Sequence, residues 1–251
     1  MSTSLVEITS LLDAQLRIAE LPDDPNALNG LQLEARPVVT HIACAVDAGE
    51  PTIEEACRIG ADLLLVHHGL GWGGNRPFTG PHGRKIRRCF EAGLSVYSAH
   101  LPLDVHPEYG NNAGIVRALG LTADGAFARY QSIEIGLTAG CDLSLQDLLM
   151  RVQKSVGECR LAGRGPARIR RLGVVSGSGG SFASAAARLG LDALLTGEGP
   201  HYTALDAEER GIHLLLAGHY RTETFGVKSL ANQLSNRFGL PFTFLEHDTG
   251  L

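Results

Sequence analysis

The sequence predicts an α/β fold made of two similar halves, and three observations support this prediction. Short apolar runs alternate with amphipathic helical patterns along the chain. Runs such as LLLV at residues 63–66 are apolar without interruption, which is typical of strands in a sheet covered on both faces. Segments of the first half also reappear in the second half with matching residue types.

The first half carries the expected elements in a regular order. The N-terminal segment MSTSLVEITSLLDAQL predicts a helix, because Ser4 and Glu7 fit a capping box ahead of an apolar stripe. Periodicity then predicts strands at residues 41–47, 61–68 and 94–100, and helices at residues 51–60 and 84–93.

The second half continues with the same kinds of element. Residues 130–140 predict an edge strand, and residues 144–157 predict a helix. The segment at residues 172–199 then predicts a strand, a glycine turn, an alanine-rich helix and a second strand.

An internal duplication explains how closely the halves match. RIGADLLLVHHG, which begins at Arg58, aligns with RLGLDALLTGEG, which begins at Arg188, so that both segments place Asp-x-Leu-Leu at the same positions. A second match sets His100-x-x-x-Asp104 against His219-x-x-x-Glu223. We therefore expect two α/β halves, residues 1–124 and 125–251, that meet in the LTADGA turn.

Composition excludes several classes of function. The chain has 251 residues, of which 44% are hydrophobic and 20% charged, with a formal net charge of −5. No basic field is therefore expected to recruit nucleic acid or an anionic membrane. No apolar run reaches the ~18 residues of a membrane helix, and the N-terminus lacks the features of a secretory signal. Five scattered cysteines without a C-x-x-C pair favour a reducing, cytoplasmic setting.

Histidines and carboxylates gather where the predicted strands end. His67 and His68 close one strand, His100 follows the next, and His219 follows a late one. If the segment from His219 to Glu223 opens a helix, its i, i+4 spacing places both side chains on one face. Imidazole and carboxylate without thiolate suit zinc, iron, manganese, cobalt or nickel, and do not choose among them.

Glycines after the histidine pair, at positions 69, 71, 73 and 74, free the backbone at this strand exit. Within a regular strand, His67 and His68 would point to opposite faces. At a flexible exit the two imidazoles can serve neighbouring positions, which suits two metal ions better than one.

Four segments resemble a known family. NGLQLE, GADLLLVHHG, SAHLPLDVHPEYGNNAGIVRALG and GHYRTETFGVKSLANQL are similar to segments of the GTP cyclohydrolase 1 type 2 homologues, also called NIF-three-like or dinuclear-metal-centre proteins. The resemblance spans nearly the whole chain in order. It implies two α/β halves without an inserted domain, and a ring-shaped oligomer, often a hexamer.

The resemblance also implies site residues. Two divalent metal ions would be held by the five residues at the matching positions, which are His67, His68, Asp104, His219 and Glu223. His100 matches a histidine that either supports these ligands or joins them. The chain departs from the family pattern in TGEGPHYTA, where Glu198 and His201 remain as a candidate acid–base pair.

Two classes of function are compatible with these residues. The first is a metal-dependent hydrolase of a nucleotide-like or phosphorylated small molecule, in which paired ions supply hydroxide at neutral pH and Glu198 or His201 moves the proton. The second is a metal-binding scaffold or carrier without turnover. A third interpretation, a metal-free nucleotide binder, would use the backbone of SGSGGS at residues 176–181, although a simple tight turn fits that segment better.

Overall fold

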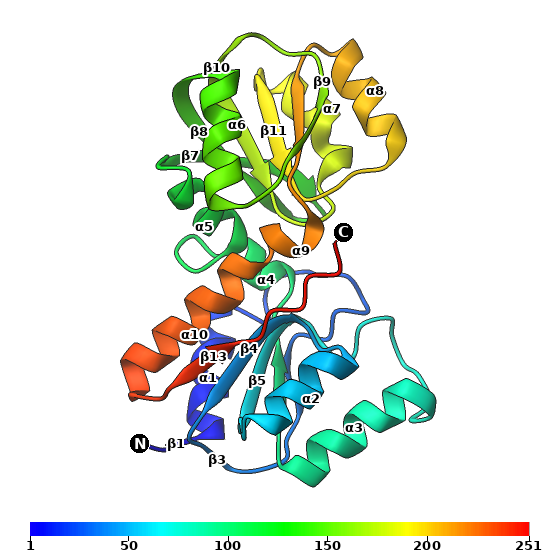
Figure 1. Ribbon diagram of the computed structural model, residues 1–251, viewed down its shortest axis with the longest axis vertical. Helices are drawn as coiled ribbons and strands as arrows, with labels where there is room; N and C mark the ends of the chain where they lie inside the picture. The colour runs from blue at the N-terminus through cyan, green and yellow to red at the C-terminus, as the bar shows by residue number, and fades with distance from the viewer. Residues whose placement is uncertain (251) are drawn as a thin grey trace. The chain divides into compact units, whose positions relative to one another are not determined.

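The computed structural model describes residues 1–250, which form two compact units that each contain a β-sheet (Figure 1). Unit 1 consists of Met1–Leu103 and Gly226–His247. Unit 2 consists of Asp104–Phe225 together with the C-terminal residues from Asp248. Both units are discontinuous in sequence, because the chain returns to unit 1 at Gly226–His247 and then ends in unit 2.

Unit 1 is built on a five-stranded sheet. Its strand order is β13 (Phe242–Phe244), β4 (Ile42–Asp47), β5 (Leu63–His68), β6 (Ser95–Ser98) and β2 (Gly30–Leu33). The first four strands are parallel and β2 is antiparallel to β6. A two-residue pair, β1 (Thr3–Ser4) with β3 (Val38–Val39), forms a separate small sheet. The predicted strands at residues 41–47 and 61–68 are thus central in the five-stranded sheet.

Helices cover both faces of the unit 1 sheet (Figure 1). The helices α2 (Glu50–Arg58) and α3 (Gly80–Ala92) lie on one face, and α1 (Leu5–Leu16) and α10 (Thr224–Phe238) lie on the other. Ile53 of α2 and Cys89 of α3 share a buried apolar cluster with alternate residues of the strands, such as Leu64 and Val66. Burial on both faces explains the uninterrupted apolar strands.

Unit 2 is built on a six-stranded mixed sheet. Its strand order is β7 (Ala123–Tyr130), β8 (Ile133–Ser144), β10 (Arg168–Val175), β11 (Ala193–Thr196), β12 (His213–Leu216) and β9 (Arg160–Gly163). Only the central three strands, β10, β11 and β12, run parallel to one another. They form the counterpart of β4, β5 and β6 in unit 1.

The unit 2 sheet also has helices on both faces. Apolar residues of α5 (Asn111–Ala118) and α6 (Leu145–Ser155) pack in one buried cluster, and those of α7 (Ala183–Arg188) and α8 (His201–Glu209) pack in another. Three short turns complete the chain: α4 (Leu101–Asp104), η1 (Gly180–Phe182) and α9 (His219–Thr222).

Two equivalent aspartates support the internal duplication. The carboxylate of Asp62 accepts hydrogen bonds from the backbone amides of Thr40 and His41, at 2.7 and 3.2 Å. Asp192 accepts from the amides of Arg170 and Arg171 in the same way, at 2.7 and 3.0 Å. Each carboxylate thus satisfies backbone donors near the start of a parallel strand. The α/β fold predicted from the sequence is confirmed.

The division between the units differs from the expected boundary between residues 124 and 125. That boundary falls within β7, inside unit 2. The helix that follows the parallel strands of the first half, α5, packs in unit 2. The equivalent helix of the second half, α10, belongs to unit 1 from Gly226 onward. Each half of the sequence thus contributes its last helix to the other unit, and a boundary placed by matching repeats cannot show this.

The segment at residues 130–140 also differs from its predicted form. It contains the turn of a hairpin, in which β7 ends at Tyr130 and β8 begins at Ile133. Gln131 has a φ of 49°. Turn positions with a positive φ usually hold glycine or asparagine, so this turn was not recognised from the sequence. β7 is the sheet edge and β8 lies between β7 and β10.

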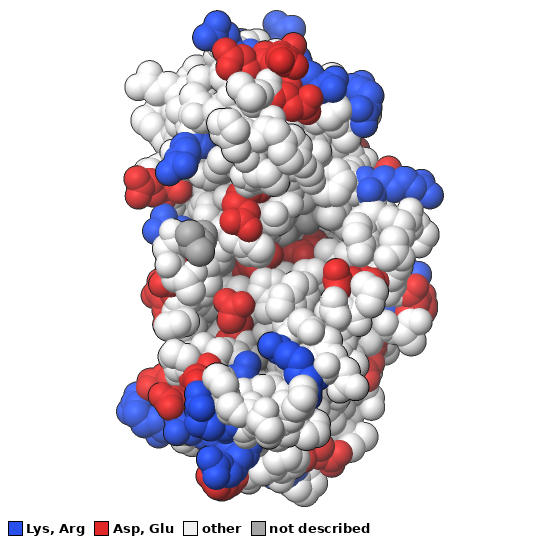
Figure 2. Space-filling model, turned by 90° about the vertical axis from the view of Figure 1, so that its right-hand side faces the viewer, with Lys and Arg blue, Asp and Glu red and all other residues white. Residues whose placement is uncertain are grey.

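Charges of both signs are mixed over the molecular surface shown in Figure 2. Two of the four basic residues of α3 pair with acidic residues of α2. Arg84 contacts Glu50 at 2.7 Å and Arg88 contacts Glu54. This helix therefore offers less free positive charge than its sequence indicates. Within residues 1–250, no helix is both long and apolar enough to cross a membrane.

Candidate metal centre

Three imidazoles meet at the carboxyl ends of two neighbouring parallel strands in unit 1. His67 and His68 end β5, and His100 follows β6. Each offers a ring nitrogen within 4.8 Å of those of the other two. The ring centroids of His67 and His68 are 4.7 Å apart, and that of His100 lies 5.0 Å from His67 and 5.5 Å from His68. The structure thus brings together three of the histidines selected from the sequence.

Oxygen acceptors fix the orientation of all three rings. The Nδ1 of His67 donates to the Ala99 carbonyl at 2.8 Å. The Nδ1 of His68 donates to Asp47 at 2.9 Å, and the Nδ1 of His100 donates to Asp23 at 2.7 Å. Because carbonyl and carboxylate oxygens only accept, each ring carries a proton on Nδ1, and Nε2 is the nitrogen that can ligate a metal. Histidines that bind metals are held in this way.

Asp23 is the centre of a hydrogen-bonded network that the sequence did not reveal. Its side chain is largely buried and also accepts from the Leu101 amide at 2.9 Å and from Asn29 Nδ2 at 2.8 Å. Asn29 in turn accepts from the backbone amide of His100 at 2.8 Å. Burial raises the pKa of Asp23, but hydrogen bonds from His100 and Asn29 outweigh burial and lower it overall. The carboxylate is therefore charged when it holds His100.

Asp47 was also not selected from the sequence as a partner of His68, although its position at a strand end pointed to that role. It is the last residue of β4, and the register of the parallel pair places it opposite His68. A carboxylate at the end of a strand next to the one that ends in histidines is a natural partner for an imidazole. Asp23 gave no such signal, because it lies in a loop 77 positions from His100.

The glycine-rich segment after His68 packs closely on its surroundings. A Cβ atom at Gly69 would lie 2.3 Å from Oε1 of Gln32, and one at Gly71 would lie 2.9 Å from Leu28. The same Gln32 oxygen accepts from the Leu70 amide at 2.6 Å. These glycines therefore allow close approach as well as a change of direction.

Trp72, in the same segment, lies against two of the imidazoles. Its ring centroid is 4.8 Å from that of His68 and 4.7 Å from that of His100. The indole therefore covers part of the histidine group.

Asp104 in unit 2 is buried and held by two side chains. Its Oδ1 accepts from Asn111 Nδ2 and from Ser176 Oγ, both at 2.8 Å. The next residue, Asn112, accepts from the Ser176 amide at 2.7 Å. Two adjacent asparagines thus tie Asp104 to the end of β10 and fix its carboxylate.

His219 of unit 2 contacts two glutamates. Its Nε2 lies 3.0 Å from Glu223, as the i, i+4 spacing predicts, and its Nδ1 lies 2.8 Å from Glu198. Burial lowers the pKa of His219, but hydrogen bonds and charge from Glu223 and Glu198 outweigh burial and raise it to about 9. The imidazole of His219 therefore lies between two carboxylates, one at each ring nitrogen.

Glu198 and His201, the candidate acid–base pair, lie in different surroundings. Glu198 contacts Nδ1 of His219 and so resembles Asp47, which contacts Nδ1 of His68. His201 begins α8 and is exposed to solvent. Within residues 1–250, no hydrogen bond or ion pair links His201 to Glu198 or His219.

The SGSGGS segment is a tight turn whose backbone donors are used internally. The amides of Gly177 and Gly179 donate to the hydroxyls of Thr222 and Thr196, at 3.0 and 2.9 Å. The amide of Gly180 donates to the Glu198 carbonyl at 3.0 Å. These donors are not available to cradle a phosphate, so the metal-free nucleotide-binding interpretation loses its support.

The donor chemistry of both units fits a divalent transition metal. Unit 1 supplies imidazole nitrogens with fixed tautomers, and unit 2 supplies an imidazole with carboxylates. Such mixed nitrogen and oxygen sets are common at zinc, iron, manganese, cobalt and nickel sites. The histidine and carboxylate clusters of the chain can therefore bind metal.

Known proteins resemble this chain over nearly its full length. Residues 3–250 match the model of the family described as Duf34/NIF3 (NGG1p interacting factor 3). A Deinococcus radiodurans protein named "GTP cyclohydrolase 1 type 2 homolog" is 46% identical over 248 residues, which cover 98% of this chain and 94% of that protein. A Pyrococcus horikoshii protein of the same name is 39% identical and covered over 98% of both chains.

Solved structures share the fold. Protein ybgI, described as of unknown function, has a TM-score of 0.92 at 32% identity, with 99% of this chain and 100% of that chain covered. TTHA1606 from Thermus thermophilus has a TM-score of 0.88 at 38% identity, over 99% of this chain and 100% of that chain. The family match over residues 3–250 and these full-length likenesses lead to one assignment. The chain belongs to the Duf34/NIF3 family.

Proposed function

We propose that this protein is a dinuclear metal-dependent hydrolase of a nucleotide-like or phosphorylated small molecule. The observation that carries the proposal is the set of three imidazoles in unit 1, each with its Nδ1 held by an oxygen acceptor. Histidines that bind metals usually have their other ring nitrogen held by an oxygen acceptor in this way, which fixes the ring and directs Nε2 toward the ion. The name shared by the curated relatives supports a nucleotide-like substrate.

The proposed ligands are those that the family resemblance implies. Two divalent ions would be held by His67, His68, Asp104, His219 and Glu223. When bound, paired ions of this kind activate water for attack at neutral pH. His100 belongs to the same imidazole group as His67 and His68, and its hydrogen bond to Asp23 prepares it to support or join them.

The protein's own groups would position the ligands and move the proton. Oxygen acceptors hold the three unit 1 rings, while Asn111 and Ser176 hold Asp104. Glu198 holds His219 and has a side chain that is 49% exposed. In the proposal, Glu198 passes the proton between the reacting water and bulk solvent, a role that needs both a site contact and exposure.

Metal analysis tests the proposed ligands. Elemental analysis of the protein purified without added metal should find about two ions per chain, as in two-metal hydrolases. His67→Ala and His219→Ala should each lose metal, because each removes a nitrogen donor. His41→Ala is the matched control, since this imidazole contacts Thr243 at 2.9 Å and none of the proposed ligands. Unchanged metal content in both ligand variants would refute the assignment.

A turnover assay separates an enzyme from a scaffold or carrier. Nucleotides and phosphoesters should be tested against the protein reloaded with zinc, iron, manganese, cobalt or nickel. We expect hydrolysis that disappears in Glu223→Ala together with its metal. Metal that binds at full occupancy with no turnover on any compound would favour the scaffold.

A further inference from the structure

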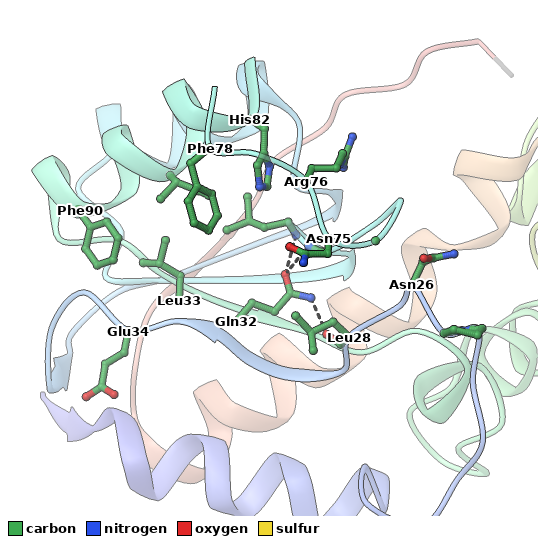
Figure 3. Close-up of a pocket in the computed structure, with 15 residues that line it drawn as sticks. Asn26, Leu28, Gln32, Leu33, Glu34, Asn75, Arg76, Phe78, His82 and Phe90 are labelled. Atoms are coloured by element: carbon green, nitrogen blue, oxygen red, sulfur yellow. Dashed lines mark hydrogen bonds between the residues drawn. The ribbon is translucent and has the colours of Figure 1, made fainter. Parts of the chain in front are cut away.

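A cavity of about 610 Å³ opens in unit 1 beside the segment that follows the histidine pair (Figure 3). Leu70 and Gly71, the second and third residues after His68, belong to its wall. The volume falls within the ~300–1,000 Å³ that is usual for sites of small molecules. None of the proposed metal ligands lines this cavity, so it is a separate feature of the same unit.

The cavity has an apolar end and a polar end (Figure 3). Phe78, Phe90 and Leu33 gather at one end, and Asn75 and Arg76 lie toward the other. His82 lies between them, with its ring stacked on that of Phe78 at a centroid distance of 5.6 Å. Phe78 and Phe90 are 74% and 58% exposed, although large aromatic side chains are usually buried. Exposed rings at the wall of a concave site offer a surface on which a flat ligand can stack.

The cavity also contains a hydrogen-bonding group that the fold does not use. The Nδ1 of His82 is buried and has no hydrogen-bond partner among residues 1–250. Burial lowers the pKa of His82, and the nearby charges of Arg76 and Lys85 lower it further. Gln32, by contrast, is fully occupied, because it donates to Leu28 at 2.5 Å and accepts from Leu70 at 2.6 Å. An orphan polar atom in a cavity indicates a missing partner.

We propose that this cavity binds the planar, heteroaromatic part of the substrate, with Phe78 stacking on its face and His82 hydrogen-bonding to its edge. The inference rests on the proposed function, which it deepens by assigning a separate subsite for the ring. A heteroaromatic ring satisfies both ends at once, since it has an apolar face and polar edge atoms. A purely aliphatic ligand would leave His82 without a partner, and a free phosphate would leave the aromatic end uncovered.

The segment between the cavity and the imidazoles connects the two. Arg76, at the polar end of the cavity, donates a hydrogen bond to the carbonyl of Trp72. The Trp72 ring lies against His68 and His100. A ring bound beside Arg76 would therefore lie next to the segment that carries Trp72.

Fluorescence of Trp72 gives a direct measurement, because this is the single tryptophan of the chain. The full-length protein is titrated with adenosine monophosphate, guanosine monophosphate and ribose 5-phosphate, in the presence of a chelator. We expect a saturable change with at least one of the two nucleotides and none with ribose 5-phosphate. A response to ribose 5-phosphate equal to that of the nucleotides would overturn the proposal.

Variants locate the binding. Phe78→Ala should lower the affinity for the nucleotide that binds by about tenfold, which is the loss expected for one aromatic stacking contact. His82→Ala should weaken it as well, since it removes the edge contact. Leu161→Ala is the matched control, because Leu161 is a 40% exposed apolar residue of unit 2. Equal affinity in Phe78→Ala and the control would place the ligand elsewhere.

The exposed rings could instead contact a second copy of the chain, and sedimentation of Phe78→Ala and of a further variant, Phe90→Ala, decides this. A change of oligomeric state in Phe78→Ala and Phe90→Ala, with unchanged nucleotide affinity, would replace the ring subsite by an interface. Failure here is distinct from failure of the proposed function. Binding is measured without metal, so it can persist in a protein that hydrolyses nothing, and metal content can be normal in a protein whose cavity stays empty.

Discussion

At the scale of single residues, carboxylates that the sequence analysis did not select fix the histidine rings. Asp47 and Asp23 decide which nitrogen of His68 and His100 carries the proton. The sequence marks the imidazoles through their place at strand ends. It does not mark Asp23, because nothing in a loop sequence shows which distant ring the loop will reach.

Replacing Asp47 should weaken metal binding without unfolding the protein. In Asp47→Ala, His68 loses the acceptor of its Nδ1 proton, so its tautomer and ring orientation are no longer fixed. Loss of such a partner typically costs 10–100-fold in metal affinity, so about that range is expected. Competition with a chelating dye measures the affinity, with Asp142→Ala as control, since Asp142 is exposed and pairs with Arg168. Equal affinities in the two variants would contradict the role given to Asp47.

Asp62 should make stability depend on acid pH. Burial raises its pKa, but hydrogen bonds from Thr40 and His41, with the charge of Arg36, outweigh burial and hold the pKa below its ordinary value. A lowered pKa in the folded state stabilises the protein at pH values above the unfolded pKa. This contribution is lost as the pH falls through the folded pKa.

Urea unfolding of Asp62→Asn between pH 7 and pH 3 tests this expectation. The variant should lose ~1–3 kcal/mol at pH 7 and show a shallower fall in stability toward acid. Asp142→Asn is the control, because an exposed ion pair contributes little to stability and weakens in salt. A pH dependence as steep as that of the unmodified protein would show that Asp62 titrates normally.

At the scale of elements, periodicity predicted the parallel strands and the helices between them, because burial on one or both faces leaves a direct mark on the sequence. The hairpin of β7 and β8 was not recognised. Its turn contains Gln131 in place of glycine or asparagine, and the tertiary structure imposes the left-handed conformation there. Turns without a chemical signal are accessible only from the fold.

The turn after β11 should not tolerate a side chain at Gly197. A Cβ atom there would lie 2.7 Å from the Gly177 carbonyl oxygen and 2.7 Å from the His219 Cα, and both are backbone atoms that cannot move aside. We expect Gly197→Ala to lose about 1–3 kcal/mol of stability, the usual cost of overpacking. Gly49→Ala is the control, since its nearest neighbour would be 3.7 Å away. Equal melting temperatures for the two variants would be inconsistent with this packing.

At the scale of the whole molecule, the sequence revealed that the chain is duplicated but not how the copies share their helices. Val227, Leu230 and Leu234 of α10 are fully buried, and β13 pairs with β4. These residues of α10, together with β13, come from the second half of the sequence and belong to unit 1. Repeat matching compares residue types at an offset, so it cannot show on which sheet a helix packs.

A fragment of residues 1–124 should therefore fail to fold by itself. It lacks α10 and β13, which leaves the part of one sheet face that α10 covers and the edge of β4 exposed. A chain that joins residues 1–103 to residues 226–247 through a flexible linker should fold, because it contains all of unit 1. Circular dichroism and thermal unfolding compare the two. Cooperative unfolding of the 1–124 fragment would contradict the division into units.

The matching aspartates Asp62 and Asp192 indicate that one ancestral segment gave rise to both sheets. An ancestor of half this length would have had its last helix directed away from its own sheet, as α5 and α10 are now. Such a chain would have become stable by exchanging that helix with a second copy of itself in a dimer. Gene fusion would then have joined two copies that already depended on each other, and we expect neither repeat to be stable alone today.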